Sequence, residues 1–457
     1  MFEDFKKTNT QEWKEQIIKD LKGGSYDDQL IWTSPENIEV QPFYNSDNLK
    51  KDTSSIFNNA DWDICEEFMV EDAKAANIEI LKALNGGANS ILLYLNEGTD
   101  LTVLLKNVLL DCIQVHIVLQ GNPVLFMKDY LNYAEQINLD SSLLNGTIHY
   151  DFIENLARTG NWFESESEDY DMLRSLLAIC PSNIRCLCID SPVYQNAGAN
   201  MIQQLGITLA ITNEYIEKYG TETLDKMAFF TAVGSNYFFE IAKLRALRNL
   251  LSFIAKEHGS TEFDPWIHAE NSVRNKSIYD PYVNMLRTGS EAMSAVLGGV
   301  DSFANRSFDY SFRTTDEFGN RIARNQQSLL KGESYIDKVA DPAAGAYYIE
   351  TLTEQMAEMA FELFKEIESN GGIVSCLKTG FIQERIEQSA LVEQESFNSN
   401  EKSLLGTNLY PNMEEKMKEE IEFTSPFCKP DKETTIQPII AKRLSEQSDL
   451  DRLNKEN

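Results

Sequence analysis

The sequence predicts an α/β protein, a (β/α)8 barrel with an N-terminal arm and a short helical C-terminal extension. Three observations predict this fold. Short apolar runs typical of buried strands alternate with apolar residues at helical spacing over most of the chain. Glycine pairs such as Gly86-Gly87 and Gly298-Gly299 follow helical stretches and mark their ends. The length of 457 residues exceeds one ordinary core but suits a barrel with appendages.

Residues 1–60 are expected to form an arm outside the barrel. Trp13, Ile17 and Leu21 have the spacing of an amphipathic helix, and Gly23-Gly24 and extended turns follow it. Large rings are numerous for a segment with little core of its own: Trp13, Trp32, Phe43 and Tyr44. Such rings pack against something, so we expect the arm to contact the barrel or a second subunit.

The barrel is expected over residues 61–395, where strand and helix patterns alternate. Apolar runs predict strands at 90–95, 113–119, 147–152, 185–190, 228–233 and 266–270. Two less clear strands, near residue 300 and at 347–349, bring the total to about eight. Helical stretches separate them, for example 285–297 and 322–330. This alternation predicts a closed barrel of parallel strands rather than an open sheet.

The remaining segments are interpreted from composition. The acidic run at 164–170 is typical of a solvated surface loop. Residues 396–457 are expected to form a C-terminal extension that starts polar, contains a helix at 438–446 and ends in a frayed tail.

Charge and cysteine content limit the classes of function. The net charge is −31, from 72 acidic and 41 basic residues, which argues against a general affinity for nucleic acid or an anionic membrane surface. No run of about 18 apolar residues occurs, so no membrane span is expected. Seven cysteines, an odd number without a signal peptide, favour a reducing, cytoplasmic location over a disulfide framework.

No metal site is expected from ligand spacing along the chain. Cys186 and Cys188 alternate within a predicted strand and would face the same side, but no histidine lies nearby in sequence. We interpret them as small core residues. The four histidines are scattered without ligand spacing: His116, His149, His258 and His268. His116 is interpreted as a strand residue.

Several longer stretches resemble the barrel domain of methylmalonyl-CoA mutases. They are DPYVNMLRT at 280–288, AVLGG at 295–299, RIARNQQ at 321–327 and DPAAGAYYIETLT at 341–353, in matching order and spacing. The resemblance extends back through 236–248 to residues 13–44 and covers nearly the whole chain. It implies a barrel that encloses an acyl-CoA along its axis, with cobalamin presented by a separate domain through a D-x-H-x-x-G motif.

The residues that the family uses for chemistry are replaced in this chain. By the resemblance, Glu67 stands where catalytic members have a substrate-side tyrosine, two residues after Cys65 in place of an arginine that holds coenzyme A. Val193 replaces a thioester-binding histidine, Trp266 a phosphate-holding arginine and Ala304 a cobalamin-facing histidine. No D-x-H-x-x-G occurs. Since each lost acid or donor typically costs about 10²- to 10⁴-fold in rate, we expect no catalytic and no cofactor-binding residues here.

The pattern is similar to the small (beta) subunits of heterodimeric members. This resemblance implies a non-catalytic chain that stabilises a catalytic large (alpha) subunit, where acyl-CoA and adenosylcobalamin bind and methylmalonyl-CoA and succinyl-CoA interconvert. Arg321, Arg324 and Asn325 are interpreted as buried structural groups rather than ligands.

Two alternatives remain open. One is an active barrel chain of a split acyl-CoA mutase that uses a separate cobalamin-binding chain, against which Val193 and Glu67 argue. The other is a binding module that keeps a coenzyme A pocket, which Trp266 and Cys65 weaken because they remove cations that phosphates need.

Overall fold

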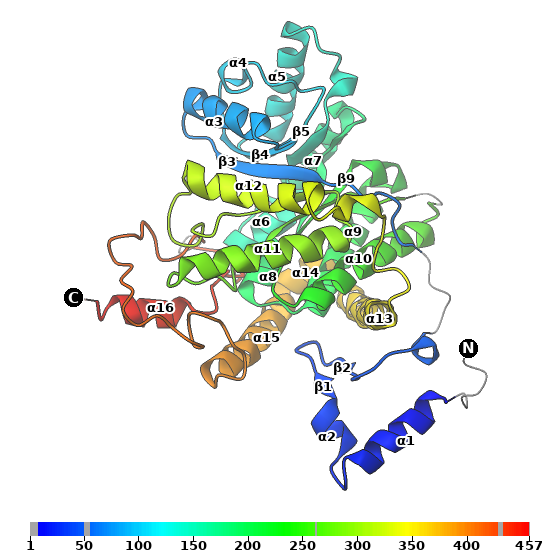
Figure 1. Ribbon diagram of the computed structural model, residues 1–457. Coiled ribbons are helices and arrows are strands. Elements are labelled where there is room, and N and C mark those ends of the chain that lie inside the picture. Colours follow the sequence, from blue (N-terminus) through cyan, green and yellow to red (C-terminus); the bar gives the residue numbers. More distant parts are fainter. Residues whose placement is uncertain (1–7, 50–54, 261–262, 428–432, 457) are drawn as a thin grey trace.

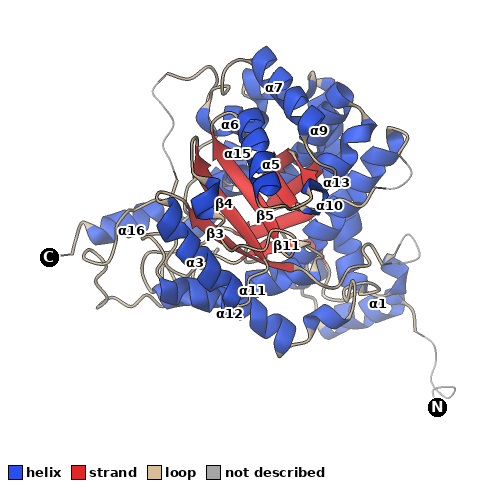
Figure 2. Ribbon diagram, turned by 90° about the horizontal axis from the view of Figure 1, so that it is seen from above, coloured by secondary structure: helices blue, strands red, loops and turns tan. Residues whose placement is uncertain are grey.

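The computed structural model describes residues 8–49, 55–260, 263–427 and 433–456, and a barrel of parallel strands lies at its centre (Figure 1). Its strands are β3 (Asp63–Met69), β4 (Ser90–Asn96), β5 (Gln114–Gln120), β6 (Gly146–His149), β7 (Ile184–Arg185), β8 (Leu187–Asp190), β9 (Met227–Val233), β10 (Ile267–Asn271) and β11 (Ser302–Ala304). They pair in parallel in the order β7-β6-β5-β4-β3-β11-β10-β9-β8. Seen from above, helices surround the strands (Figure 2).

One interrupted strand closes the barrel. β7 and β8 occupy the two ends of the strand order, and only Cys186 separates them in the chain. Cys186 N donates to Lys226 O at 3.0 Å, which continues the pairing across the break. Cys186 and Leu187 both belong to the core between barrel and helices, whereas Cys188 packs inside the barrel. The expectation that Cys186 and Cys188 share one face is therefore wrong, because the break shifts the alternation by one residue.

The predicted barrel is confirmed, with one strand misplaced. Residues 347–349 begin a helix, α13 (Tyr347–Ser369), because Ile349, Leu352 and Met356 bury one helical face. The eighth strand is instead β3, where Glu66 and Glu67 interrupt the apolar pattern that marks the other strands.

Helices cover the outside of the barrel. They are α3 (Ala73–Asn85), α4 (Leu101–Leu104), α5 (Pro123–Gln136), α6 (Phe152–Thr159), α7 (Glu166–Ile179), α8 (Pro192–Ala197), α9 (Met201–Tyr219), α10 (Tyr237–Glu257), α11 (Pro281–Leu297), α12 (Glu317–Gly332), α13, α14 (Gly372–Thr379) and α15 (Phe381–Asn398). The predicted stop of α11 at Gly298 is confirmed. The predicted acidic loop is wrong: Ser165 caps α7, and acidic residues of its first turn favour the helix dipole. No helix in the described ranges is long and apolar enough to cross a membrane.

The N-terminal segment lies against α10 and α13, at the lower right of Figure 1. It contains α1 (Thr10–Asp20), α2 (Tyr26–Leu30) and a two-stranded hairpin, β1 (Trp32–Thr33) with β2 (Glu39–Val40). The rings of Trp32 and Phe239 are 5.7 Å apart, and those of Tyr44 and Tyr348 are 5.0 Å apart. Helix α1, which is described throughout, buries none of its residues.

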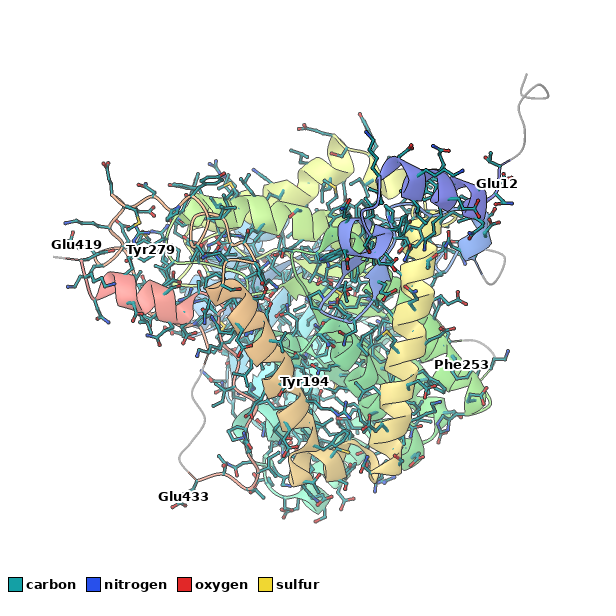
Figure 3. The ribbon with its side chains drawn as sticks, turned by 90° about the horizontal axis from the view of Figure 1, so that it is seen from below. Glu12, Tyr194, Phe253, Tyr279, Glu419 and Glu433 are labelled. Atoms are coloured by element: carbon teal, nitrogen blue, oxygen red, sulfur yellow. The ribbon has the colours of Figure 1, made fainter. Side chains whose placement is uncertain are left out.

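The C-terminal segment returns along the barrel and ends in α16 (Glu446–Leu453). The helix predicted at 438–446 is wrong, because the backbone there bonds to other segments: Ile439 N donates to Ala157 O at 2.7 Å and Leu444 N to Arg274 O at 2.8 Å. Tyr279 lies beside α16 (Figure 3), and Arg452 covers its ring at 3.6 Å. The extension is thus packed onto the barrel at several points.

Candidate functional site

Side chains that face the barrel axis form two small clusters apart from the main core. The first holds Cys65, Leu92 and Ala304; the second holds Cys188, Ala228, Phe230 and Trp266. The main core lies instead between the strands and the helices. In a barrel of eight strands the interior is either filled by side chains or holds one small ligand, so the size of the inward side chains decides whether a ligand fits.

Rings occupy the barrel interior. The ring centroids of His116 and Trp266 are 5.0 Å apart, and those of Phe230 and His268 are 4.9 Å apart. The guanidinium of Arg185 lies 5.2 Å from the ring of Trp266. Trp266 is 7% exposed, Phe230 4%, and the two histidines 1% or less. At this level the barrel is a packed core rather than a channel.

Three buried histidines line this interior. Burial lowers the pKa of His149 and His268 to about 3 and also lowers that of His116. All three are therefore neutral near pH 7. Nδ1 of His116 lies 3.1 Å from Thr147 Oγ1, and Nδ1 of His268 lies 3.0 Å from Ser302 Oγ. These hydroxyls hold the rings of His116 and His268 in one orientation.

An arginine and two glutamates close the carboxyl-terminal mouth, where barrels of this class place their active sites. Arg306 follows β11 and bonds both oxygens of Glu67 at 3.2 Å and Oε2 of Glu270 at 2.7 Å. Each of the three side chains is at most 14% exposed. Burial raises the pKa of Glu270 to about 7, against the lowering effect of Arg306. Arg306 is therefore paired with carboxyl groups of this cluster, which leaves no unpaired guanidinium in it for an anionic ligand.

Further carboxylates surround this mouth. Burial raises the pKa of Asp151 to about 7, although it accepts from Asp190 N at 2.9 Å and from the Tyr215 hydroxyl at 3.2 Å. Burial, together with Glu154 and Glu270, also raises the pKa of Asp190. Acidic groups thus outnumber cations where a phosphate-bearing substrate would approach.

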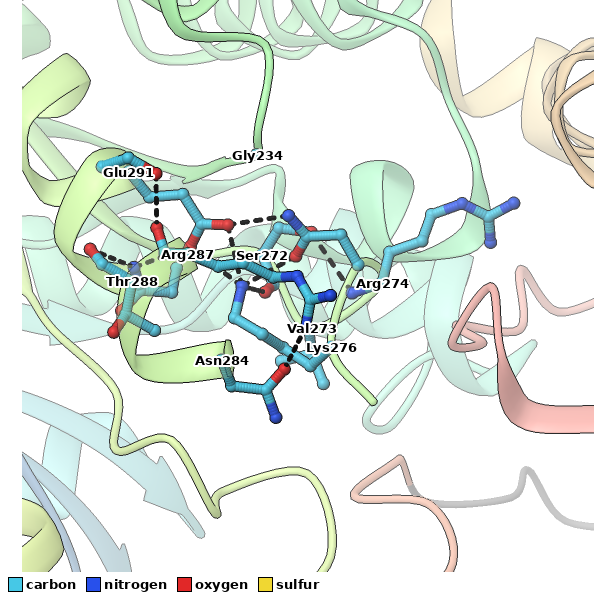
Figure 4. A network of polar contacts seen from close by, with 12 residues as sticks. Gly234, Ser272, Val273, Arg274, Lys276, Asn284, Arg287, Thr288 and Glu291 are labelled. Atoms are coloured by element: carbon cyan, nitrogen blue, oxygen red, sulfur yellow. Dashed lines mark hydrogen bonds and ion pairs between the residues drawn. The ribbon is translucent and has the colours of Figure 1, made fainter. Parts of the chain in front are cut away.

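The loop after β10 is held by a buried ion pair (Figure 4). Lys276 Nζ lies 2.8 and 2.9 Å from the two carboxylate oxygens of Glu291. Asn271 and Asn275 donate to the same carboxylate at 2.8 and 2.7 Å. Glu291 is fully buried. Because every oxygen of this carboxylate is bonded within the chain, the network braces the loop and offers no site for chemistry.

The structure does not bring the four predicted degenerate positions into one site. Trp266 lies just before β10, at the amino end of the barrel, and Glu67 lies near the carboxyl end of β3. Ala304 packs on Cys65 and Leu92 inside the barrel, whereas Val193 lies on α8 in the main core. None of the four exposes a free polar group to a common cavity.

The arginine-rich stretch of α12 is partly structural. Arg324 forms an ion pair with Glu66 and donates to Gly86 O at 3.1 Å, which joins α12 to β3 and to the end of α3. Arg321 and Asn325 are exposed, so the interpretation of these two as buried groups is wrong. Their side of the helix faces solvent, whereas Ala323 and Gln327 are buried.

The groups that fill the barrel could not be found from spacing along the chain. His116 lies on β5, His268 and Glu270 lie on β10, and Arg306 follows β11, so spacing links only the two residues of β10. The available signal is a charged residue at an inward strand position, as Glu67 is in β3 and Glu270 in β10. Such residues need a buried partner, and Arg306 supplies it.

The model of the methylmalonyl-CoA mutase family matches residues 93–455 of the chain. The chain is 33% identical over 449 residues to the methylmalonyl-CoA mutase small subunit of Porphyromonas gingivalis, covering 91% of this chain and 72% of that relative. The small subunit of Streptomyces virginiae is 28% identical over 425 residues, covering 87% of this chain and 68% of the relative.

A mitochondrial relative is more distant. The methylmalonyl-CoA mutase of Homo sapiens is 26% identical over 457 residues, which cover 87% of this chain but only 60% of that protein. The match therefore spans roughly two thirds of the length of such relatives.

Proposed function

Because the chain belongs to the methylmalonyl-CoA mutase family, we propose that it acts as the small (beta) subunit of a heterodimeric methylmalonyl-CoA mutase. In this role it is non-catalytic and stabilises a large subunit that interconverts methylmalonyl-CoA and succinyl-CoA. Residues 1–60 serve as the arm that contacts the partner, 61–395 as the barrel and 396–457 as the extension. Two of the relatives matched above are named small subunits, which supports this assignment.

The filled axis is the observation that carries the proposal. An acyl-CoA threaded along the barrel, as the family resemblance implies, needs the volume that Trp266, Phe230 and His116 occupy. All three side chains are buried, so side chains rather than free volume occupy the axis at this level. A chain with this interior is better suited to support a partner than to hold substrate.

Charge at the mouth supports the same conclusion. Coenzyme A carries phosphates, and the mouth presents the carboxyl groups of Glu67, Glu270 and Asp190 where phosphates would need cations. Arg306 is already bonded to two of them. Substrate therefore binds at the partner subunit in this proposal.

The position that would face cobalamin does not fit that cofactor. Mutases of this family use adenosylcobalamin. Ala304 is 1% exposed and packs against Cys65 and Leu92, so it offers neither a polar atom nor free surface. We assign the cofactor to the partner subunit and derive no step through it on this chain.

The N-terminal segment is the proposed partner contact. Trp32 is 50% exposed and Phe43 47%, and α1 has no fully buried residue. Exposed rings rimmed by polar residues are typical of subunit interfaces.

The test is mutase activity with adenosylcobalamin for this chain alone, for the large subunit alone and for the two mixed. We expect turnover only when the large subunit is present, and higher or longer-lived turnover when this chain is added. A matched mixture with the Trp266→Ala variant, which opens space along the barrel axis, is expected to give no higher turnover than the mixture with the unchanged chain. Turnover by this chain with a separate cobalamin-binding protein would overturn the proposal.

A further inference from the structure

Three potential metal ligands from three strands meet inside the barrel. They are Cys65 on β3, His116 on β5 and His268 on β10, and the thiol sulfur and one nitrogen of each ring all lie within 4.8 Å of one another. All three residues are buried, with exposures of 3%, 0% and 1%. The strand β4 separates β3 from β5, and β11 separates β3 from β10, so only closure of the barrel brings the three together.

The two histidines have the same unusual hydrogen bonding. Nδ1 of each is held by a hydroxyl, Thr147 at 3.1 Å and Ser302 at 3.0 Å, whereas Nε2 of each is buried without a hydrogen-bond partner. Buried polar atoms nearly always have a partner, so two such nitrogens beside one thiol need an explanation. A histidine that binds a metal through one ring nitrogen is usually oriented by a hydrogen bond at the other ring nitrogen.

We propose that the barrel binds one thiophilic transition-metal ion, such as Zn²⁺, through Cys65 Sγ, His116 Nε2 and His268 Nε2. One sulfur and two imidazole nitrogens suit borderline and soft ions and exclude Mg²⁺ and Ca²⁺, which prefer oxygen. Metal–nitrogen and metal–sulfur bonds of about 2.0–2.3 Å require ligand atoms about 3.3–3.6 Å apart, so ligand atoms that lie within 4.8 Å of one another approach by at most about 1.5 Å on binding.

A fourth ligand and compensating charge are at hand. Ser90 is the register partner of Cys65, and its hydroxyl is fully buried without a hydrogen-bond partner. It can complete a tetrahedral site directly or through a water molecule. Asp63, two residues before Cys65 on β3, supplies a further carboxyl group on the same face of the strand. The ion ties β3, β5 and β10 together across the interior, a structural use of space that a substrate channel would otherwise take.

The test uses the full chain with Zn²⁺ and Co²⁺ as the probes. The chain is produced in medium supplemented with Zn²⁺, and separately refolded from denaturant with Zn²⁺, because the site closes with the barrel. Elemental analysis after gel filtration is expected to give one ion per chain. Refolding with Co²⁺ is expected to give the thiolate-to-cobalt absorption band that a cysteine ligand produces.

Matched variants separate a metal site from ordinary core packing. We expect Cys65→Ser to lose the cobalt band, and Cys65→Ser and His268→Gln to weaken Zn²⁺ binding by at least about 100-fold, beyond the 10- to 100-fold typical of a lost second-layer partner. Cys188 and His149 are buried in the same barrel. The Cys188→Ser and His149→Gln variants are expected to bind Zn²⁺ as the unchanged chain does.

The melting temperature and circular dichroism distinguish a loss of metal binding from misfolding of a variant. Zn²⁺ is expected to raise the melting temperature of the wild-type chain, and to leave that of Cys65→Ser unchanged while the circular dichroism of both is alike. A wild-type chain without ion after both preparations refutes the proposal, as does equal binding by Cys65→Ser and Cys188→Ser.

Discussion

Replacing Glu270 by glutamine tests the buried charge group at the barrel mouth. Glu270 is 11% exposed in its side chain and shares Arg306 with Glu67, so two carboxylates face one guanidinium. Burial raises the pKa of Glu270 from 4.5 to about 7. Glutamine keeps the size of the side chain and an oxygen for Arg306 but does not titrate.

The expected effect follows from the pKa of Glu270 in the two states. Below pH 4.5 the folded and unfolded chains both hold the proton; between 4.5 and about 7 only the folded chain holds it. The free energy of unfolding of the unchanged protein therefore falls as pH rises through this window. The rise in pKa corresponds to about 3 kcal/mol, at about 1.4 kcal/mol for each tenfold change in proton affinity. In Glu270→Gln the free energy of unfolding does not fall in this way. The difference in free energy of unfolding between the variant and the unchanged chain should therefore shift in favour of the variant by about 2–3 kcal/mol from pH 5 to pH 8.

Urea denaturation at several pH values between 5 and 8, followed by tryptophan fluorescence, measures this difference. The control is Glu317→Gln, whose carboxylate is 76% exposed and should change the free energy of unfolding by less than about 0.5 kcal/mol at every pH. Parallel curves for Glu270→Gln and the unchanged chain would refute the account of the buried charge group.

Three further changes test other parts of the structure. Gly146→Ala should lower the free energy of unfolding by about 2–4 kcal/mol, measured by urea denaturation, because a Cβ there would meet Val115 O and because φ is +138°. Arg443→Ala should lower it by about 3–5 kcal/mol, since it leaves the carboxylate of Asp449 buried without its cation; a loss below 1 kcal/mol would contradict this. Deletion of residues 1–50 should abolish co-purification with the large subunit while circular dichroism stays that of a folded barrel, and intact association would show that the arm is not the contact.

Much of the barrel could be predicted because its signals are local. The strands β4, β5 and β9 are short apolar runs, and the end of α11 is marked by Gly298. β3 carries the acidic pair Glu66 and Glu67, whose partners come from far along the chain, so its sequence does not indicate a buried strand. Residues 347–349 are typical of a strand but extend a helix whose buried face only tertiary packing selects.

The contents of the barrel could not be predicted for a different reason. Whether a strand residue points inward depends on register, and the break at Cys186 changes the register within one strand. The meeting of Cys65, His116 and His268 depends on three separate strands, so spacing along the chain gave no ligand pattern. The replaced residues at 67, 193, 266 and 304 were visible in sequence, but the packing of Trp266 with Phe230 and His116 inside the barrel was not.

The single residue between β7 and β8 is an extra residue in an otherwise alternating strand. With Cys186 present, Arg185 reaches Trp266 and Cys188 packs beside it, while Leu187 turns toward the helices. Deleting Cys186 would join the two segments into one regular strand in which Arg185 and Cys188 still face the interior and Leu187 still faces the helices. The loss of one residue at this point is thus expected to be tolerated better than the loss of one from β9, where every side chain beyond the deletion would exchange its surroundings.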